Sequence, residues 1–329
     1  MKASVVIPTK NGEQYLEEVL KAVFSQQVTF EFEVVVIDSG STDRTLSILR
    51  QFPLRLLQIP PLDFNHGETR NQAIAHAQGE FIALITQDAT PADPRWLANL
   101  VGAFAEEDVA GVFGPHLTRG DCDPIETRNL IQHFRNFGLE RTHVRIDDEA
   151  DYHARQGWYD FFSNCNSCLR RSVWERIPFR RTSMAEDQMW AQDVLKAGYV
   201  KVYEPSAAVY HSHAYSPWIH LKRSFDEFRS YRILENPGGY HRLRQIFPGV
   251  FREIAHDLRY IRRESGLPLH QKLHWYWNYP LINVGRKMGG YLGTNYRRLP
   301  QAVQDFLSLQ EANRRRGAKR QVLQAMETP

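Results

Sequence analysis

Polar and acidic residues gather directly after three strand-like runs in the first third of the chain. The clusters are PTKNGE at residues 8–13, DSGSTD at 38–43 and TQDA at 86–89. In a parallel sheet covered by helices, ligands bind where the carboxyl ends of the strands meet. Carboxylates at that edge suit a nucleoside and a metal ion better than a bare phosphate. The sequence has no GxxxxGK[ST] phosphate loop and no GxGxxG turn after a strand, which argues against ATPases and dehydrogenases.

The elements that must position these clusters alternate between strand and helix over the first 115 residues. Apolar runs typical of buried strands, and apolar residues at helical spacing or behind helix-capping residues, follow one another along this stretch. The expected strands are 4–8, 31–40, 54–60, 80–86 and 109–115, and the expected helices are 15–24, 41–52, 68–78 and 95–104. This order predicts an α/β fold of Rossmann type, with a mostly parallel sheet flanked by helices.

The rest of the chain changes character. The acidic run 147–151 predicts a solvated loop, 186–197 a helix ended by Gly198, and 200–213 a strand. From Pro217 onward the pattern is helical, although Pro280 and several glycines interrupt an aromatic segment. We therefore expect a catalytic domain over 1–215 and a basic, aromatic-rich helical C-terminal region over 216–329.

The net charge of +3 conceals an uneven distribution. Residues 1–215 hold 21 Lys and Arg against 29 Asp and Glu, whereas residues 216–329 hold 20 against 9. A basic C-terminal region suits anionic lipid, nucleic acid or an acidic partner. Its aromatic residues suit a membrane interface, helix packing or a homo-oligomer interface.

The chain carries the marks of a cytoplasmic protein. Met1 leads directly into a strand-like run rather than a signal sequence, and no apolar stretch reaches the roughly 18 residues that span a bilayer. Three cysteines are too few for a disulfide framework, and the CxxC formed by Cys165 and Cys168 has no second pair for zinc. We expect a cytoplasmic location, peripheral on the inner face of the cytoplasmic membrane if the basic region contacts lipid.

Four motifs in order resemble the family 2 inverting glycosyltransferases of the GT-A fold. They are VVIPTKNG, VVVIDSGSTDRT, TRNQAIAHAQGEFIALITQDA and AEDQMW, and the resemblance covers roughly residues 3–213. The stretches DFNHGETRN, TQDA and HSHAYS are most similar to bacterial rhamnosyltransferases. The resemblance implies transfer of L-rhamnose from dTDP-β-L-rhamnose, with inversion, to a hydroxyl of a glycan or lipid-linked oligosaccharide in cell-surface polysaccharide synthesis.

The same resemblance assigns residues to the nucleotide-sugar donor. Asp38 matches the carboxylate that accepts the N3–H of the base, with a turn followed by a helix cap as the alternative. Arg70 matches a residue near the nucleotide, and a surface position on a helix is the alternative. The full donor set is Pro8, Thr9, Glu13, Asp38, Ser39, Arg70, Asn71 and Gln87.

The TQDA cluster corresponds to the family's DxD, which holds a divalent metal ion on the diphosphate. Thr86 stands where the first Asp is usual, and Asp88 retains the second position. The resemblance implies Mg²⁺ or Mn²⁺, because both take oxygen ligands and the donor's phosphates supply several. His213 is a candidate further ligand, with a structural role as the alternative. For His211 the structural role is favoured.

AED at 185–187 matches the family's ED motif, which implies that Asp187 is the general base. Glu186 would orient the acceptor or support the loop, and Trp190 would stack on a sugar. In the family, the segment that carries Asn164, Asn166 and Ser167 borders the acceptor and the donor sugar, and Asn166 and His66 complete the residues assigned to the sugars. The alternatives are that Glu186 and Asp187 merely begin a helix and that Trp190 belongs to the core.

Other functions remain open at this point. A UDP-sugar donor would keep the chemistry and change the base. A nucleotidyltransferase needs a glycine-rich basic loop near the amino terminus, and PTKNG is a poor match. A nucleic-acid-binding protein would use the basic C-terminal region but would leave the acidic strand ends without a purpose. A non-catalytic scaffold is suggested only by Thr86.

Overall fold

The structure is a computed structural model that describes residues 2–120, 122–182, 184–213, 215–234, 243–263 and 266–312. The chain divides into two compact units. The first holds Met1–Gly120 and Asn129–Ser212, and the second holds Asp121–Arg128 and His213–Pro329. The second unit thus includes a short segment from the middle of the part expected to be catalytic.

An eight-stranded sheet forms the centre of the first unit. Its order is β3-β2-β1-β4-β9-β6-β10-β8. The strands are β1 (Ala3–Thr9), β2 (Phe32–Asp38), β3 (Arg55–Gln58), β4 (Phe81–Ile85), β6 (Val109–Phe113), β8 (Thr142–Val144), β9 (Asn166–Arg170) and β10 (Val200–Tyr203). Neighbours pair in parallel except around β9, which is antiparallel to β4 and β6, and at the edge strand β8. The predicted mostly parallel sheet is confirmed.

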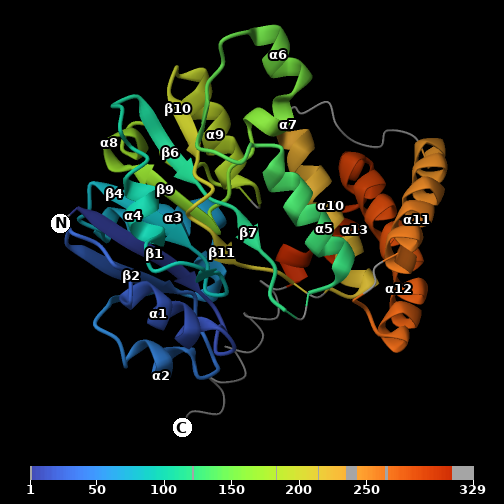
Figure 1. Cartoon of the computed structure of the whole chain (residues 1–329), viewed down its shortest axis with the longest axis horizontal. Helices are drawn as coiled ribbons and strands as arrows, with labels where there is room; N and C mark the ends of the chain where they lie inside the picture. Colours follow the sequence, from blue (N-terminus) through green and yellow to red (C-terminus); the bar gives the residue numbers. More distant parts are fainter. Residues whose placement is uncertain are drawn as a thin grey trace. The chain divides into compact units, whose positions relative to one another are not determined.

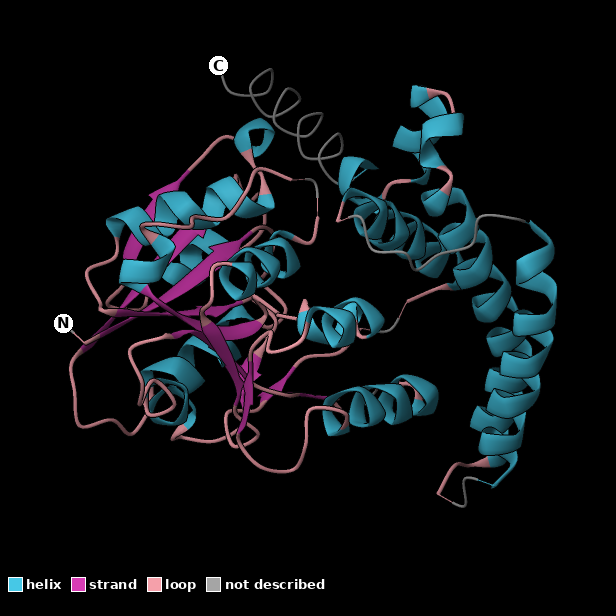
Figure 2. Cartoon of the chain, turned by 90° about the horizontal axis from the view of Figure 1, so that it is seen from above, coloured by secondary structure: helices cyan, strands magenta, loops and turns pink. Residues whose placement is uncertain are grey.

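Helices cover both faces of this sheet (Figures 1 and 2). Successive residues of a strand point to opposite faces, so Val5 and Ile7 join one core cluster while Val6 joins the other. The first cluster contains α1 (Leu16–Phe24), α2 (Thr45–Leu49) and α4 (Trp96–Val101). The second contains α3 (His66–His76) and α9 (Glu186–Lys196). Burial on both faces explains the uninterrupted apolar runs of the central strands.

The polar middle of the first unit is more ordered than the sequence predicts. The run 147–151 is not simply a loop, because the Asp148 side chain accepts a hydrogen bond from the Ala150 N–H and caps α6. The helical elements up to residue 174 that are not yet named are η1 (Pro61–Asp63), α5 (Pro124–Arg135), α6 (Glu149–Ala154), α7 (Gln156–Tyr159) and α8 (Arg171–Trp174).

A second, three-stranded sheet brings together three distant parts of the first unit. It consists of β5 (Thr90–Pro91), β11 (Val209–Tyr210) and β7 (His116–Leu117), with β11 in the middle. β11 pairs antiparallel with β5 and parallel with β7. The segments that follow Ile85, Phe113 and Tyr203 in the large sheet are therefore joined just beyond its edge.

The second unit is helical, as predicted. Its elements are α10 (Pro217–Ile233), η2 (Leu243–Gln245), α11 (Ile246–Arg263), α12 (Leu269–Thr294), η3 (Tyr296–Arg298) and α13 (Gln301–Leu307), with α12 packed against both α10 and α11. The expected interruption at Pro280 is wrong, because α12 continues through it. Its glycines instead permit close packing: a Cβ at Gly289 would lie 2.1 Å from the Leu221 carbonyl oxygen of α10.

This close approach makes a stability prediction. Gly289→Ala forces α10 and α12 apart and should lower the free energy of unfolding by about 1–3 kcal/mol, the usual cost of overpacking. Gly249→Ala is the matched control, because its Cβ would meet only Lys287 at 3.8 Å. Alanine there should be neutral or stabilise the helix by up to about 1 kcal/mol. Urea unfolding measures both, and equal effects would contradict the packing account.

Candidate active site

Two loops at the ends of β1 and β2 are joined by hydrogen bonds. Asn11, whose φ of 50° is one that asparagine tolerates, accepts from the Thr42 N–H at 2.8 Å. The Asn11 N–H donates to Ser41 Oγ at 2.8 Å, and the Gly12 N–H donates to Thr45 Oγ1 at 2.8 Å. The predicted nucleotide loops therefore form one rigid edge.

Asp38 lies at the centre of this edge and is fully buried. Its Oδ1 accepts from the N–H groups of Gly40 and Ser41, and its Oδ2 accepts from the hydroxyls of Thr9 and Ser41. These four bonds give Asp38 the turn-forming role that the sequence left open. A nucleobase would have to replace one of them. The neighbouring Ser39 hydroxyl is buried without a hydrogen-bond partner among the described residues, which leaves it available to a ligand.

The other predicted donor residues lie around the same edge. Pro8 is half-buried at the end of β1, and Glu13 accepts from the Arg44 backbone and side chain at 3.2 Å. Gln87 bonds both the N–H and the carbonyl of Lys10, so it ties the segment after β4 to the first loop.

Asn71 has a structural role instead. Its amide group donates to the Phe179 carbonyl at 2.8 Å, and its oxygen accepts from Trp174 Nε1 and the Phe179 N–H. These bonds engage both ends of the amide in holding residues 174–179 against α3.

A buried ion pair joins α3 to the start of α9. Arg70 Nη1 lies 3.0 Å from Glu186 Oε1, and both side chains are about 5% exposed. Asn164 donates its amide N–H to Glu186 at 3.0 Å and its backbone N–H to Asp187 at 3.1 Å. Glu186 therefore binds Arg70 and Asn164, which fits the expected role in supporting the loop rather than the role of orienting an acceptor. Asp187, the predicted base, remains partly exposed beside it.

The electrostatics of the two carboxylates differ. Burial and the adjacent Glu186 carboxylate raise the pKa of Asp187 to about 7. Burial opposes the charged form of Glu186 too, but Arg70, His66 and the Asn164 hydrogen bond together outweigh it and lower the pKa of Glu186. The protein thus keeps one carboxylate charged and holds the other near its titration point at neutral pH, which suits a general base.

Two residues assigned to the sugars are placed elsewhere. Trp190 is fully buried between Phe162 and Phe179 and donates to the Ile177 carbonyl, so the prediction that it stacks on a sugar is wrong. Asn166 is also fully buried, and its side chain bonds Trp96, Pro115 and Ala207. It braces β9 and cannot reach a ligand.

His66 opens α3 close to Glu186, where its charge acts on that carboxylate. Its carbonyl accepts from Arg70 at 3.0 Å. Its ring meets Phe64 edge-on at 4.9 Å. His66 therefore lies near Glu186, and its assignment to the sugars stays a prediction.

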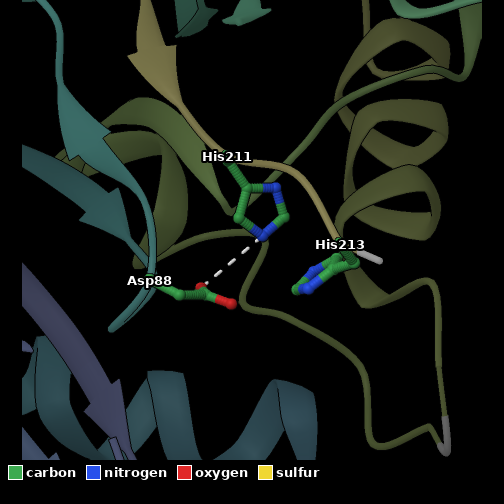
Figure 3. Close-up of side chains that lie close together, drawn as sticks. All are labelled: Asp88, His211 and His213. Carbon is green, nitrogen blue, oxygen red and sulfur yellow. Dashed lines mark ion pairs between the residues drawn. The ribbon is translucent and has the colours of Figure 1, made fainter. Parts of the chain in front are cut away.

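A group suited to a divalent cation lies at the small sheet. Asp88 follows β4 and precedes β5, whereas His211 and His213 follow β11. Their ligand atoms all lie within 4.8 Å of one another, and His211 Nε2 is 3.5 Å from Asp88 Oδ1 (Figure 3). One carboxylate oxygen and two imidazole nitrogens are donors that Mn²⁺ accepts, so the residues fit the implied metal. Thr86 Oγ1, in the place of the missing Asp, is buried without a hydrogen-bond partner among the described residues.

Sequence reasoning assigned two of these three residues and gave His211 a structural role. The HSH spacing was the available signal, because alternate residues of an extended segment share a face. Asn164 was expected only on a segment bordering the acceptor and donor sugar, because nothing local in the sequence indicates its contacts with residues 22 and 23 positions away.

Comparisons with known proteins identify the family of this chain. The glycosyl transferase family 2 profile matches residues 4–177. The O-antigen chain rhamnosyltransferase RfbN of Salmonella typhimurium is 30% identical over 94% of this chain and 95% of its own length. The O-antigen chain rhamnosyltransferase WbaN of Salmonella anatum is 30% identical over 93% of both chains.

Two solved structures share the fold. The mannosyltransferase PcManGT from Pyrobaculum calidifontis, in complex with GDP-Man and Mn²⁺, superposes with a TM-score of 0.58 at 19% identity over 89% of this chain and 86% of that chain. TarS 1–349 of S. aureus, in complex with UDP-GlcNAc, gives 0.52 at 18% identity over 91% and 92%. At these identities the likeness establishes a common fold.

The carboxylate pair predicts a titration change. In Glu186→Gln, Asp187 loses its like-charged neighbour and gains the influence of an unpaired Arg70, so its pKa should fall from about 7 toward 4. Carboxyl ¹³C NMR of aspartate-labelled protein measures it. Glu13→Gln, at an exposed ion pair, should leave it unchanged. An unaltered Asp187 pKa in Glu186→Gln would contradict the coupling.

Proposed function

The chain belongs to glycosyl transferase family 2, and we propose that it transfers L-rhamnose from dTDP-β-L-rhamnose to a glycan hydroxyl with inversion. The observation that carries the proposal is that one site holds both Asp187, a carboxylate with a pKa of about 7, and the metal-binding group of Asp88, His211 and His213. Burial raises the pKa of the Cys165 thiol, and the carboxylates of Asp88 and Asp187 both add to that rise, so each acts on the same side chain. The rhamnosyl donor rests on the likeness of nearly the whole chain to RfbN and WbaN.

The proposed reaction is a single displacement. Asp187 accepts the proton of the acceptor hydroxyl as its oxygen bonds to the anomeric carbon. The bond from that carbon to the diphosphate breaks on the opposite face, and the nucleoside diphosphate leaves with the bonding electrons. Arg70 keeps Glu186 charged, and Asn164 orients Asp187 through its backbone N–H. A divalent ion bound by Asp88, His211 and His213 would neutralise the charge on the leaving diphosphate.

The donor set favours Mn²⁺ over Mg²⁺. Mg²⁺ prefers oxygen ligands in near-ideal octahedral geometry, whereas imidazole suits the transition metals. Two of the three protein ligands here are imidazoles. Because Thr86 replaces the first Asp of the motif, Asp88 is the one carboxylate in the group, and the imidazoles of His211 and His213 supply the other protein ligands.

Activity gives the direct test. With Mn²⁺ and an O-antigen acceptor, the protein should release dTDP from dTDP-β-L-rhamnose and form an α-rhamnoside, identified by NMR. Asp187→Asn should reduce kcat by about 10²–10⁴-fold, the usual contribution of a general base. Because the base acts deprotonated, kcat/KM should rise with pH through about 7. Transfer from a UDP-sugar but not from dTDP-rhamnose would overturn the donor, and a β-product would overturn inversion.

The second unit has a surface suited to bringing the protein to a membrane-bound acceptor. We propose that its exposed apolar residues dock on the cytoplasmic face of a membrane that carries a lipid-linked acceptor. None of the described helices is long and apolar enough to cross a bilayer. Four exposed apolar residues of α12 are spaced four apart, so they lie on one side of that helix: Leu269, Leu273, Trp277 and Leu281. Two more exposed apolar residues, Phe247 and Phe251, belong to α11.

The charges of α11 fit an anionic surface. Its two carboxylates are already paired, Glu253 with Lys287 and Asp257 with Arg128. Its four arginines, Arg252, Arg259, Arg262 and Arg263, are exposed. Exposed arginines on α11, together with the exposed Trp277 on α12, give the composition of a surface that binds at a membrane interface.

Vesicle flotation tests this docking. The pair Leu273→Ser and Trp277→Ser should weaken binding to phosphatidylglycerol vesicles tenfold or more, because each buried apolar side chain contributes about 1.5–3 kcal/mol. Leu139→Ser, at a side chain that is 82% exposed in the first unit, is the matched control and should bind as the native chain does. If the paired variant instead turns a dimer into a monomer, with no vesicle binding by either form, the surface joins two copies of the chain.

A further inference from the structure

Arg119 lies two residues beyond β7 and belongs to none of the sites assigned above. Its side chain is only 13% exposed. It comes close to both halves of the metal-binding group, although sequence separates them by more than 120 residues. A role for Arg119 at that group rests on the proposed function and deepens it.

The Arg119 side chain holds the Asp88 segment. Nη2 donates to the Asp88 carbonyl at 3.0 Å and to Thr90 Oγ1 at 2.8 Å, while Nη1 donates to Glu18 Oε1 at 2.9 Å. The Thr90 hydroxyl donates to the same Glu18 oxygen at 2.6 Å. The guanidinium carbon also lies 4.2 Å from the centroid of the Tyr15 ring. One planar group thus links the segment after β4 to α1.

The Arg119 backbone holds the histidine segment. Its N–H donates at 3.0 Å to the hydroxyl of Ser212, the residue between His211 and His213. The His211 N–H donates to the Leu117 carbonyl at 2.8 Å, which continues the pairing of β11 with β7. The histidine segment is therefore fixed to the strand that carries Arg119.

We propose that Arg119 is a positioning residue that sets the distance between Asp88 and the two histidines before a metal ion binds. With Thr86 in place of the first Asp, the protein offers a single carboxylate, and the affinity for the ion depends on the prior arrangement of three donors. Arginine suits this role because its rigid fork makes several hydrogen bonds in fixed directions, which lysine cannot reproduce.

The alternative is that Arg119 only stabilises the first unit. Arg141 supplies the matched control, because it also bridges a glutamate and a carbonyl in that unit: it donates to Glu204 Oε2 at 2.6 Å and to the Gly102 carbonyl at 3.4 Å. A purely stabilising role would make Arg119→Gln and Arg141→Gln behave alike in every assay.

The experiment is a titration of Mn²⁺ in the presence of dTDP, followed by electron paramagnetic resonance of the free ion, with thermal unfolding of the metal-free protein alongside. Arg119→Gln should weaken Mn²⁺ binding about 10–100-fold, the range for residues that orient metal ligands. Arg119→Lys should also weaken it, whereas Arg141→Gln should retain the native affinity despite a lower Tm. Should Arg119→Gln fail to fold, Thr90→Val removes one of its contacts and should weaken binding a few-fold.

The outcomes separate two failures. Native Mn²⁺ affinity in Arg119→Gln, or an equal loss in Arg141→Gln, would overturn the positioning role and leave the proposed function intact. If the native chain binds no Mn²⁺ with dTDP, the metal-dependent function falls, and the role of Arg119 falls with it.

Discussion

Glu186 and Asp187 are adjacent at the start of α9, and the buried guanidinium of Arg70 favours the charged form of both carboxylates. Arg70 forms an ion pair with Glu186, whereas at Asp187 the cost of burying a charge dominates and raises the pKa. Several local features serve this arrangement. Asn65 caps α3 and donates to the Thr182 carbonyl, Gly67 allows a backbone approach that a Cβ would block at 2.1 Å, and Ala185 holds a φ of 63° just before the pair. A left-handed alanine costs about 1 kcal/mol or more, so the surrounding structure must hold it in place.

The small sheet imposes the complementary constraint on the metal-binding group. Each of its strands is only two residues long, yet each carries a residue that matters at its boundary: Asp88 precedes β5, His211 follows β11, and Arg119 follows β7. Strands this short add little stability of their own. Their value is geometric, because they place ligands from segments far apart in sequence within reach of one cation.

The sequence allowed prediction of what depends on local pattern. Central strands buried on both faces read as continuous apolar runs, and the order of the strands along the chain was enough to place the polar clusters after β1, β2 and β4 at one edge of the sheet. Asp187 and Asp88 were assigned through motifs that match a family in order. What could not be predicted depends on partners distant in sequence. Trp190 and Asn166 carry polar groups that look suited to a ligand, but they bond the chain itself.

The same limit explains the other differences. A proline in the middle of a segment predicts a break, yet α12 runs through Pro280, and its glycines lie against the backbone of α10. Tertiary packing of that kind overrides local propensity. Likewise, the antiparallel β9 could not be recognised as a central strand, because its neighbours β4 and β6 are set by topology rather than by its own residues.

The claim on which the account depends is that Asp88, His211 and His213 hold a divalent ion against a nucleoside diphosphate near Asp187. The most direct measurement is anomalous diffraction at the manganese edge from crystals grown with dTDP and Mn²⁺. We expect one strong peak bounded by these three side chains and the diphosphate. A peak at other carboxylates, or a nucleotide bound away from the end of β1, would contradict it.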